Sequence, residues 1–170
     1  LFIASEARWP QKGLSLRQET RFPDEDTVRF SFSCADPVRM TLKLRYPPWA
    51  EQGMELKVNG RKTPADRDPS GYVAVSRTWQ SGDAVEMKIA FTLRLETMPD
   101  NPSRVAVFYG PVLLAGDLGP VDDPSRGLAE FVPVLVTGGK PPADWLDPLP
   151  GRPCGFRLRG VGKPSDVDLL

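Results

Sequence analysis

The sequence predicts an all-β protein built around an antiparallel, jelly-roll-like β-sandwich. The main observation is a period of two, in which apolar and polar side chains alternate along several short segments. Such alternation gives a strand one buried and one solvated face, which is typical of antiparallel sheets. The segments are separated by Gly, Pro and Asn-Gly turn signals at short intervals, which favours a sandwich or a barrel.

The predicted strands follow one another closely along the first half of the chain. The alternating segments are Val28–Cys34, Val38–Tyr46, Met54–Val58, Tyr72–Trp79 and a long one from Val85 to Leu95. Asn59-Gly60 tolerates the positive φ angles of a tight hairpin turn and directly follows the third segment. We expect a core in which the following side chains meet across two sheets: Phe30, Phe32, Leu42, Leu44, Ile89, Phe91 and Val107.

Composition changes near Pro99, and twelve of the 19 prolines lie from that residue onward. Arg104–Ala115 still predicts buried strand, so we place the sandwich at residues 1–116. Residues 117–170 are predicted to be an irregular Pro/Gly-rich extension, a linker followed by partial strands at Phe131–Val136, Phe156–Arg159 and Val167–Leu170. The chain starts without Met and stops inside a strand-like segment, so we expect a truncated piece of a longer protein.

Composition and charge exclude several classes of function. Lys and Arg together number 22, as do Asp and Glu, and no basic run suggests a nucleic-acid partner. No apolar run approaches the ~20 residues that span a bilayer, so no membrane partner is expected. The chain has no histidine, the commonest general base and metal ligand.

The remaining reactive side chains do not predict an active site. Cys34 and Cys154 have no zinc-ligand spacing, and Cys34 is expected to be a buried thiol, although a disulfide between the two stays open. The acidic groups Asp24–Asp26, Asp66 with Asp68, and Asp122-Asp123 are predicted to be solvated loop charge, with a surface calcium ion as the alternative. We therefore assign no catalytic, cofactor-binding or metal-binding residue.

Four tryptophans are the candidates for sugar contacts, because exposed aromatic rings can stack on pyranoses. Trp9, Trp49 and Trp79 lie at strand edges, where a ring more often covers the core. Trp145 lies in the Pro/Gly-rich region and is expected to be the most exposed of the four. Coplanar exposed rings would indicate an autonomous carbohydrate-binding module, and buried rings would indicate a scaffold.

Several segments together resemble glycoside hydrolase family 127, the β-L-arabinofuranosidase-like family first catalogued as a domain of unknown function. The segments are LFIASEARW (1–9), LRQETRFP (16–23), LKLRYPPWA (42–50), VNGR (58–61), WQSGD (79–83), LRLETMPDNPSRVAVFYGPVLLAG (93–116) and FRLRGVGKPSDV (156–167). They occur in the expected order over nearly the whole chain.

The resemblance implies an (α/α)6-barrel catalytic domain followed by β-sandwich domains. It also implies a cysteine nucleophile, zinc held by cysteines and a glutamate, and a glutamate acid/base, all in the barrel. Neither Cys34 nor Cys154 has the adjacent-cysteine motif, so we carry over no residue and expect zinc only in the catalytic domain. The expected function is a non-catalytic sandwich that packs against that barrel. The alternative is an autonomous carbohydrate-binding module, and a second subunit stays open as a partner.

Overall fold

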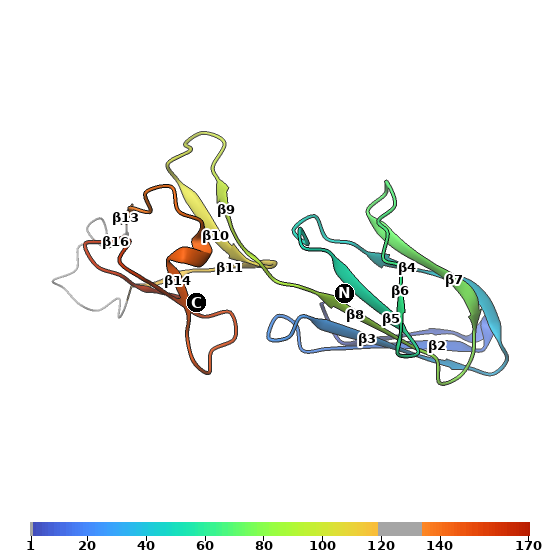
Figure 1. The fold of residues 1–170 in the computed structure, drawn as a ribbon. Coiled ribbons are helices and arrows are strands. Elements are labelled where there is room, and N and C mark those ends of the chain that lie inside the picture. Colours follow the sequence, from blue (N-terminus) through green and yellow to red (C-terminus); the bar gives the residue numbers. More distant parts are fainter. Residues whose placement is uncertain (1, 119–133) are drawn as a thin grey trace. The chain divides into compact units, whose positions relative to one another are not determined.

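The computed structural model describes residues 2–118 and 134–170. In this part of the chain nearly all regular structure is β-strand, and the helical segments are the 3₁₀ turns η1 (Pro10–Lys12) and η2 (Pro142–Asp144). The predicted all-β class is confirmed (Figure 1). None of the helices in these residues is long and apolar enough to cross a membrane.

The chain divides into two compact units, Leu1–Phe91 and Thr92–Leu170. The predicted boundary at Gly116 rests on a change in composition, whereas the units divide where each segment joins its own hydrophobic core. Most of the predicted linker, together with Asp122-Asp123 and Phe131, lies outside the described residues.

The first unit is a two-layer antiparallel sandwich. Its larger layer is a six-stranded sheet in the order β1-β2-β3-β8-β5-β6. These strands are β1 (Ser5–Trp9), β2 (Leu14–Thr20), β3 (Thr27–Cys34), β8 (Ala84–Ile89), β5 (Met54–Val58) and β6 (Arg61–Thr63). The predicted hairpin turn joins β5 to β6, with Asn59 at φ 50° and Gly60 at φ 75°.

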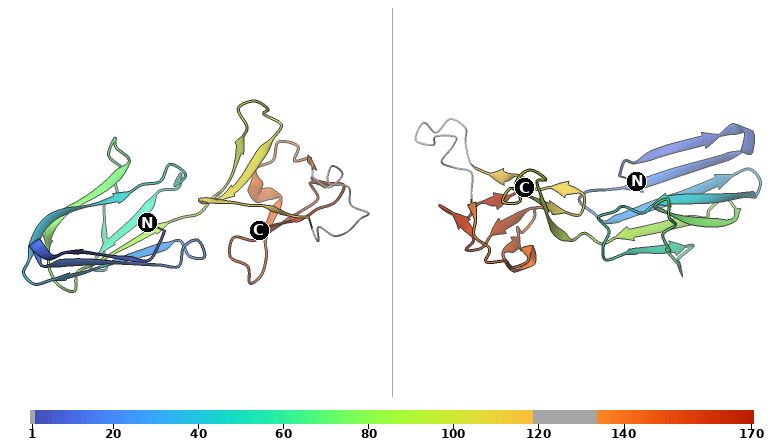
Figure 2. Two further views of the ribbon diagram at one scale, coloured as in Figure 1. Left: turned by 180° about the vertical axis from the view of Figure 1, so that it is seen from behind. Right: turned by 90° about the horizontal axis from the view of Figure 1, so that it is seen from above.

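The second layer of this unit is a two-stranded sheet of β4 (Val38–Arg45) and β7 (Tyr72–Trp79). The strands pair along their whole length, and Leu42 lies opposite Val75. Figure 2 shows this layer lying over the six-stranded sheet in two further views. The alternation seen in the sequence therefore places one face of each strand between the layers.

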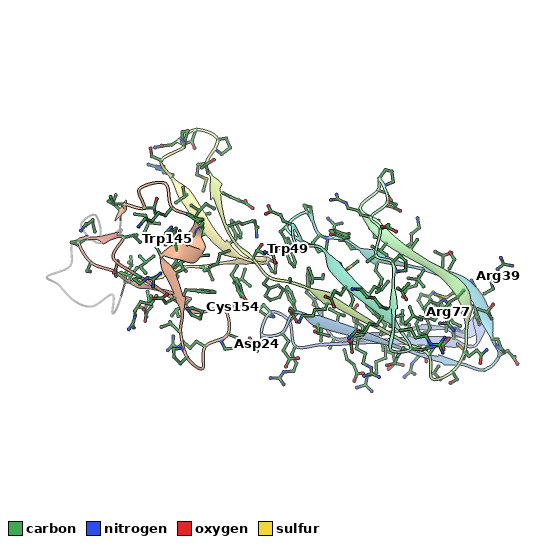
Figure 3. All side chains as sticks on the ribbon, viewed as in Figure 1. Asp24, Arg39, Trp49, Arg77, Trp145 and Cys154 are labelled. Atoms are coloured by element: carbon green, nitrogen blue, oxygen red, sulfur yellow. The ribbon has the colours of Figure 1, made fainter. Side chains whose placement is uncertain are left out.

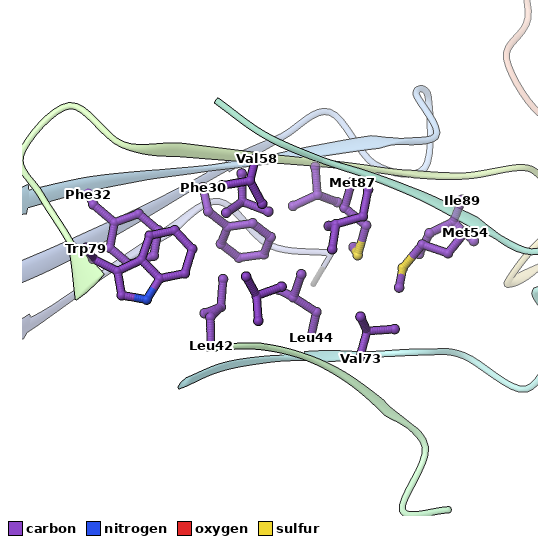
Figure 4. Packing of buried hydrophobic residues seen from close by; sticks show 14 of the residues in the cluster. Phe30, Phe32, Leu42, Leu44, Met54, Val58, Val73, Trp79, Met87 and Ile89 are labelled. Carbon is purple, nitrogen blue, oxygen red and sulfur yellow. The ribbon is translucent and has the colours of Figure 1, made fainter. Parts of the chain in front are cut away.

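The core of the first unit fills the space between the two sheets (Figure 4). Phe30, Phe32 and Ile89 reach into it from the larger sheet, and Leu42 and Leu44 meet them from the smaller one. All five are at most 7% exposed, as the sequence predicts. Phe91 is only half-buried, and Val107 belongs to the core of the other unit, so these two members of the predicted core are corrected.

The second unit consists of short strands around its own core. A three-stranded sheet contains β9 (Leu93–Thr97), β10 (Val105–Tyr109) and β11 (Val112–Leu113), in the order β11-β10-β9. A four-stranded sheet contains β12 (Gly116–Asp117), β17 (Asp168–Leu169), β15 (Phe156–Leu158) and β14 (Leu146–Pro148). β13 (Val134–Leu135) pairs with β16 (Gly162–Lys163). The core side chains are Val107, Leu114, Trp145, Leu146, Phe156, Leu158, Val161 and Leu169.

The predicted strand from Val85 to Leu95 is wrong as a single element. β8 ends at Ile89 within the first unit, and β9 begins at Leu93 within the second. Leu93 packs against the second core, whereas Leu95 is 36% exposed. The apolar alternation continues across the break because it reports which residues face an interior, and not which interior they face.

Candidate functional site

Two of the four candidate tryptophans are core residues. Trp79 is fully buried, its ring stacks on Phe32 with centroids 4.0 Å apart, and its indole N–H donates to the Met40 carbonyl over 3.1 Å. Trp145 is 1% exposed, and its indole N–H donates to the Lys140 carbonyl over 3.1 Å. The expectation that Trp145 is the most exposed ring is therefore wrong (Figure 3).

Trp49 belongs to a half-buried aromatic cluster with Phe2, Phe22 and Phe91. Phe2 stacks on Phe22 at 4.0 Å, and Trp49 meets Phe91 edge-on at 5.8 Å. The cluster joins three segments that carry the family resemblance, LFIASEARW, LRQETRFP and LKLRYPPWA. Offset and edge-to-face rings attract one another beyond their buried area, so this cluster holds distant segments together.

Trp9 is the exposed ring, at 41%. It lies opposite Leu14 on the edge strand β1, whose five residues are all exposed. The expectation that Trp9 covers the core is wrong, because the two-stranded layer does not bury β1. One exposed ring among four does not make the coplanar platform that would indicate sugar stacking.

The two cysteines are half-buried thiols that pack against different cores. Burial, with a further contribution from the charge of Asp83, raises the pKa of the Cys34 thiol. A raised pKa keeps the thiol protonated at neutral pH and lowers its reactivity as a nucleophile. Cys34 is thus half-buried against the first core, and not the fully buried thiol that the sequence predicts.

The carboxyl groups do not have the environment of a glycosidase acid, which needs a raised pKa. In residues 2–118 and 134–170, every carboxyl with a shifted pKa is shifted downward: Glu6, Asp68, Asp83, Asp166 and Asp168. Hydrogen bonds from Ser70 and from the Tyr72 backbone lower the pKa of Asp68, which lies in a turn before β7. These groups are ionised at neutral pH.

The described residues do not fit the zinc that the family resemblance implies. No group of three His, Cys, Asp or Glu side chains comes together in this part of the chain. Structural and catalytic zinc sites take three or four such ligands.

An apolar hollow of about 1040 Å³ lies on the second unit and is lined by described residues of that unit. The most exposed of its apolar side chains are Leu113 at 57% and Val134 at 64%, and Leu95, Val105 and Leu118 lie between 36% and 38%. The sequence predicts Arg104–Ala115 to be buried strand, whereas Leu113 within it is exposed and lines this hollow. Gly110-Pro111 instead turns the chain into a hairpin, with Phe108 opposite Leu113, whose side chain points outward.

Comparisons with known proteins agree with the geometry of the first unit. The family model described as β-L-arabinofuranosidase, GH127 middle domain, matches residues 1–91, which are the residues of that unit. No protein in a search of curated sequences matches the chain.

Solved structures of glycoside hydrolases have the same fold. A GH127 β-L-arabinofuranosidase from Geobacillus stearothermophilus is similar with a TM-score of 0.63 and 28% identity, over 76% of this chain and 21% of that one. A GH127 β-arabinofuranosidase gives a TM-score of 0.66 at 20% identity, over 99% of this chain and 30% of that one. A further glycoside hydrolase gives 0.65 at 22% identity, over 99% and 31%.

The chain therefore spans less than a third of the length of these three enzymes. Its first unit is matched by a family model from end to end, and that match covers 91 of the 170 residues. This chain thus belongs to the GH127 β-L-arabinofuranosidase family, as a glycoside-hydrolase-associated domain whose residues 1–91 are the family's middle domain.

Proposed function

We propose that this chain is a non-catalytic β-sandwich accessory region of a glycoside hydrolase and packs against the (α/α)6-barrel catalytic domain of the same protein. The family model names a middle domain, which lies between other parts of a longer chain. The similar enzymes are three to five times as long as the stretch that this chain matches. The cysteine nucleophile and the zinc that the resemblance implies belong, in this proposal, to the catalytic domain.

The apolar hollow of the second unit is the observation that carries the proposal. Soluble monomers rarely expose contiguous apolar patches beyond a few hundred Å² without using them for binding. Here Leu95, Val105, Leu113, Leu118 and Val134 are all more than one-third exposed around a single hollow. A partner that fills this hollow would remove these side chains from water, at about 25 cal/mol per Å² of apolar surface.

The chain provides a matched pair of substitutions to test docking. Leu113 lines the hollow and is 57% exposed, whereas Val136 is 59% exposed and does not line it. Leu113→Asp and Val136→Asp therefore add the same charge at equally exposed positions. In the isolated chain each should change the free energy of unfolding by only about 0.5 kcal/mol, as is usual for surface substitutions.

In the whole enzyme the two variants should differ. A carboxylate at position 113 would be trapped, without a partner charge, against an apolar surface, which costs about 2 kcal/mol or more. We expect Leu113→Asp to lower the thermal unfolding midpoint and to shorten the half-life of glycosidase activity on heating. Val136→Asp should leave both unchanged. Equal behaviour of the two variants in the whole enzyme would contradict docking through the hollow.

A further inference from the structure

The outward face of the β4–β7 sheet carries an unbalanced positive charge. Alternation along β4 points Arg39, Lys43 and Arg45 away from the core, and all three are exposed. Neither strand contains an Asp or Glu residue. The face therefore carries three cations in a chain whose formal net charge is zero.

The six-stranded sheet of the same unit differs in that its strands contain carboxylates, Glu6, Glu19, Glu55 and Glu86, beside the basic residues. Four of the seven basic residues in its strands pair with carboxylates, in Arg8–Glu6, Arg17–Glu19, Lys57–Glu86 and Lys88–Asp26, whereas Arg29, Arg61 and Lys62 pair with no described carboxylate. No ion pair with a described carboxylate involves Arg39, Lys43 or Arg45. The charge of Asp68 interacts weakly with Lys43, but that carboxylate accepts hydrogen bonds from Ser70 and Tyr72.

Hydroxyl groups lie between the cations on the same face. Thr41 and Ser76 are cross-strand neighbours whose hydroxyl oxygens are 2.8 Å apart, and Thr78 lies opposite Arg39. These residues line an open hollow of about 620 Å³ together with Met40 and Arg77. Figure 3 shows Arg39 and Arg77 at the same end of the first unit.

We propose that this outward face binds a polysaccharide that carries carboxylate groups, that is, one rich in uronic acids. Outward side chains on an antiparallel strand recur every ~6.8 Å, so the cations form a line that an extended polymer can follow. The cations would pair with carboxylates and the hydroxyls with the sugar hydroxyls between them. The carbohydrate class follows from the family of the chain. This function goes beyond the accessory role and does not depend on docking to the barrel.

Charges on exposed strands also discourage edge-to-edge pairing, and both strands of this sheet are edges. That role needs no ligand and predicts no affinity for a polymer. The two roles therefore differ in a binding measurement.

The test uses the 170-residue chain and polygalacturonate, measured by calorimetry and by affinity electrophoresis. The variant is Lys43→Glu with Arg45→Glu, and the matched control is Arg61→Glu with Lys62→Glu. The control makes the same change in net charge at two exposed positions of β6, where neither side chain has an ion pair with a described carboxylate. Circular dichroism checks that both variants are folded.

We expect the unmodified chain to bind polygalacturonate and not its carboxyl-reduced counterpart. The Lys43/Arg45 variant should lose affinity by about tenfold or more, and the control by much less, because charges beyond ~8 Å are screened at physiological salt. Raising the salt to about 1 M should abolish binding. No binding, equal losses in the two variants, or equal affinity for DNA of similar charge density would overturn the proposal.

Discussion

Phe32→Ala is the most informative change in the core of the first unit. Phe32 is 3% exposed, and its ring lies nearly parallel to that of Trp79, with centroids 4.0 Å apart and planes inclined by 10°. Burial of a Phe side chain accounts for about 3–5 kcal/mol in such substitutions. Loss of an aromatic pair adds about 0.5–1.5 kcal/mol, part of which is already included in that range. We expect a loss of about 4 kcal/mol in the free energy of unfolding.

The measurement is equilibrium unfolding in urea, followed by tryptophan fluorescence and far-ultraviolet circular dichroism. The chain has two compact units, so the curve is fitted with a separate transition for each. Phe32→Leu is the control, because it keeps most of the apolar volume and should cost less than about 1.5 kcal/mol. If Phe32→Ala lost less than about 1 kcal/mol, the ring would not be packed between the two sheets, and the sandwich as described would be refuted.

Two further changes test the second unit. The Asp166 carboxylate accepts backbone hydrogen bonds from Gly160, Gly162 and Val161, and these bonds lower its pKa in the folded protein. The ionised carboxylate therefore stabilises the fold fully above the unfolded pKa of about 3.9, and this stabilisation is lost as the pH falls through the folded pKa. Asp166→Asn should therefore lower the free energy of unfolding by about 1 kcal/mol at neutral pH, after allowance for screening at an exposed site. In acid unfolding curves the two proteins should become equally stable. A difference in stability that stays constant down to pH 2, about two units below the unfolded pKa, would contradict this. Gly162→Ala should cost about 1–3 kcal/mol in thermal unfolding, because a Cβ there would lie 2.4 Å from the Ser165 carbonyl oxygen. Gly116→Ala is the control and should be tolerated, because its nearest contact would be at 3.7 Å. Similar unfolding midpoints for the two variants would contradict the close approach at Gly162.

The strands of the first unit were predictable because three signals coincide there. In β3, β4, β5 and β7 the alternation is regular, its apolar face is buried, and turn residues bound the segment. The Asn59-Gly60 turn fixes the register of its hairpin by local backbone preference alone. Such elements depend on residues close in sequence, which a single sequence shows.

The second unit was less predictable because its contacts are not local. β11, β12, β13, β16 and β17 are two residues long, too short to show a period. Trp145 lies among Pro, Gly and Asp residues that indicate a loop, yet its ring is buried among strands from distant parts of the unit. Local composition indicates the backbone conformation that a segment prefers. The burial of a side chain in that segment depends on which distant segments pack against it.

For the candidate surfaces too, the sequence shows the residues of each segment, and the structure shows which segments lie together. The sequence gives the charges of Arg39, Lys43 and Arg45, and the alternation of β4 places them on one face. The absence of acidic residues from the paired strand β7 matters only once the pairing is known. Leu113 was assigned to a buried strand, because an apolar residue in a hairpin looks the same in sequence whether it faces the interior or the solvent.

Hydroxyl-radical footprinting of the whole enzyme tests the accessory role most directly, by comparing Leu113 with Val136. In this chain the two side chains are almost equally exposed, at 57% and 59%, so their rates of modification, corrected for intrinsic reactivity, should be similar in the isolated 170-residue protein. If the hollow of the second unit packs against the catalytic domain, Leu113 should be modified several-fold more slowly in the whole enzyme while Val136 is unchanged. Equal modification of both side chains in the whole enzyme would contradict the proposed packing.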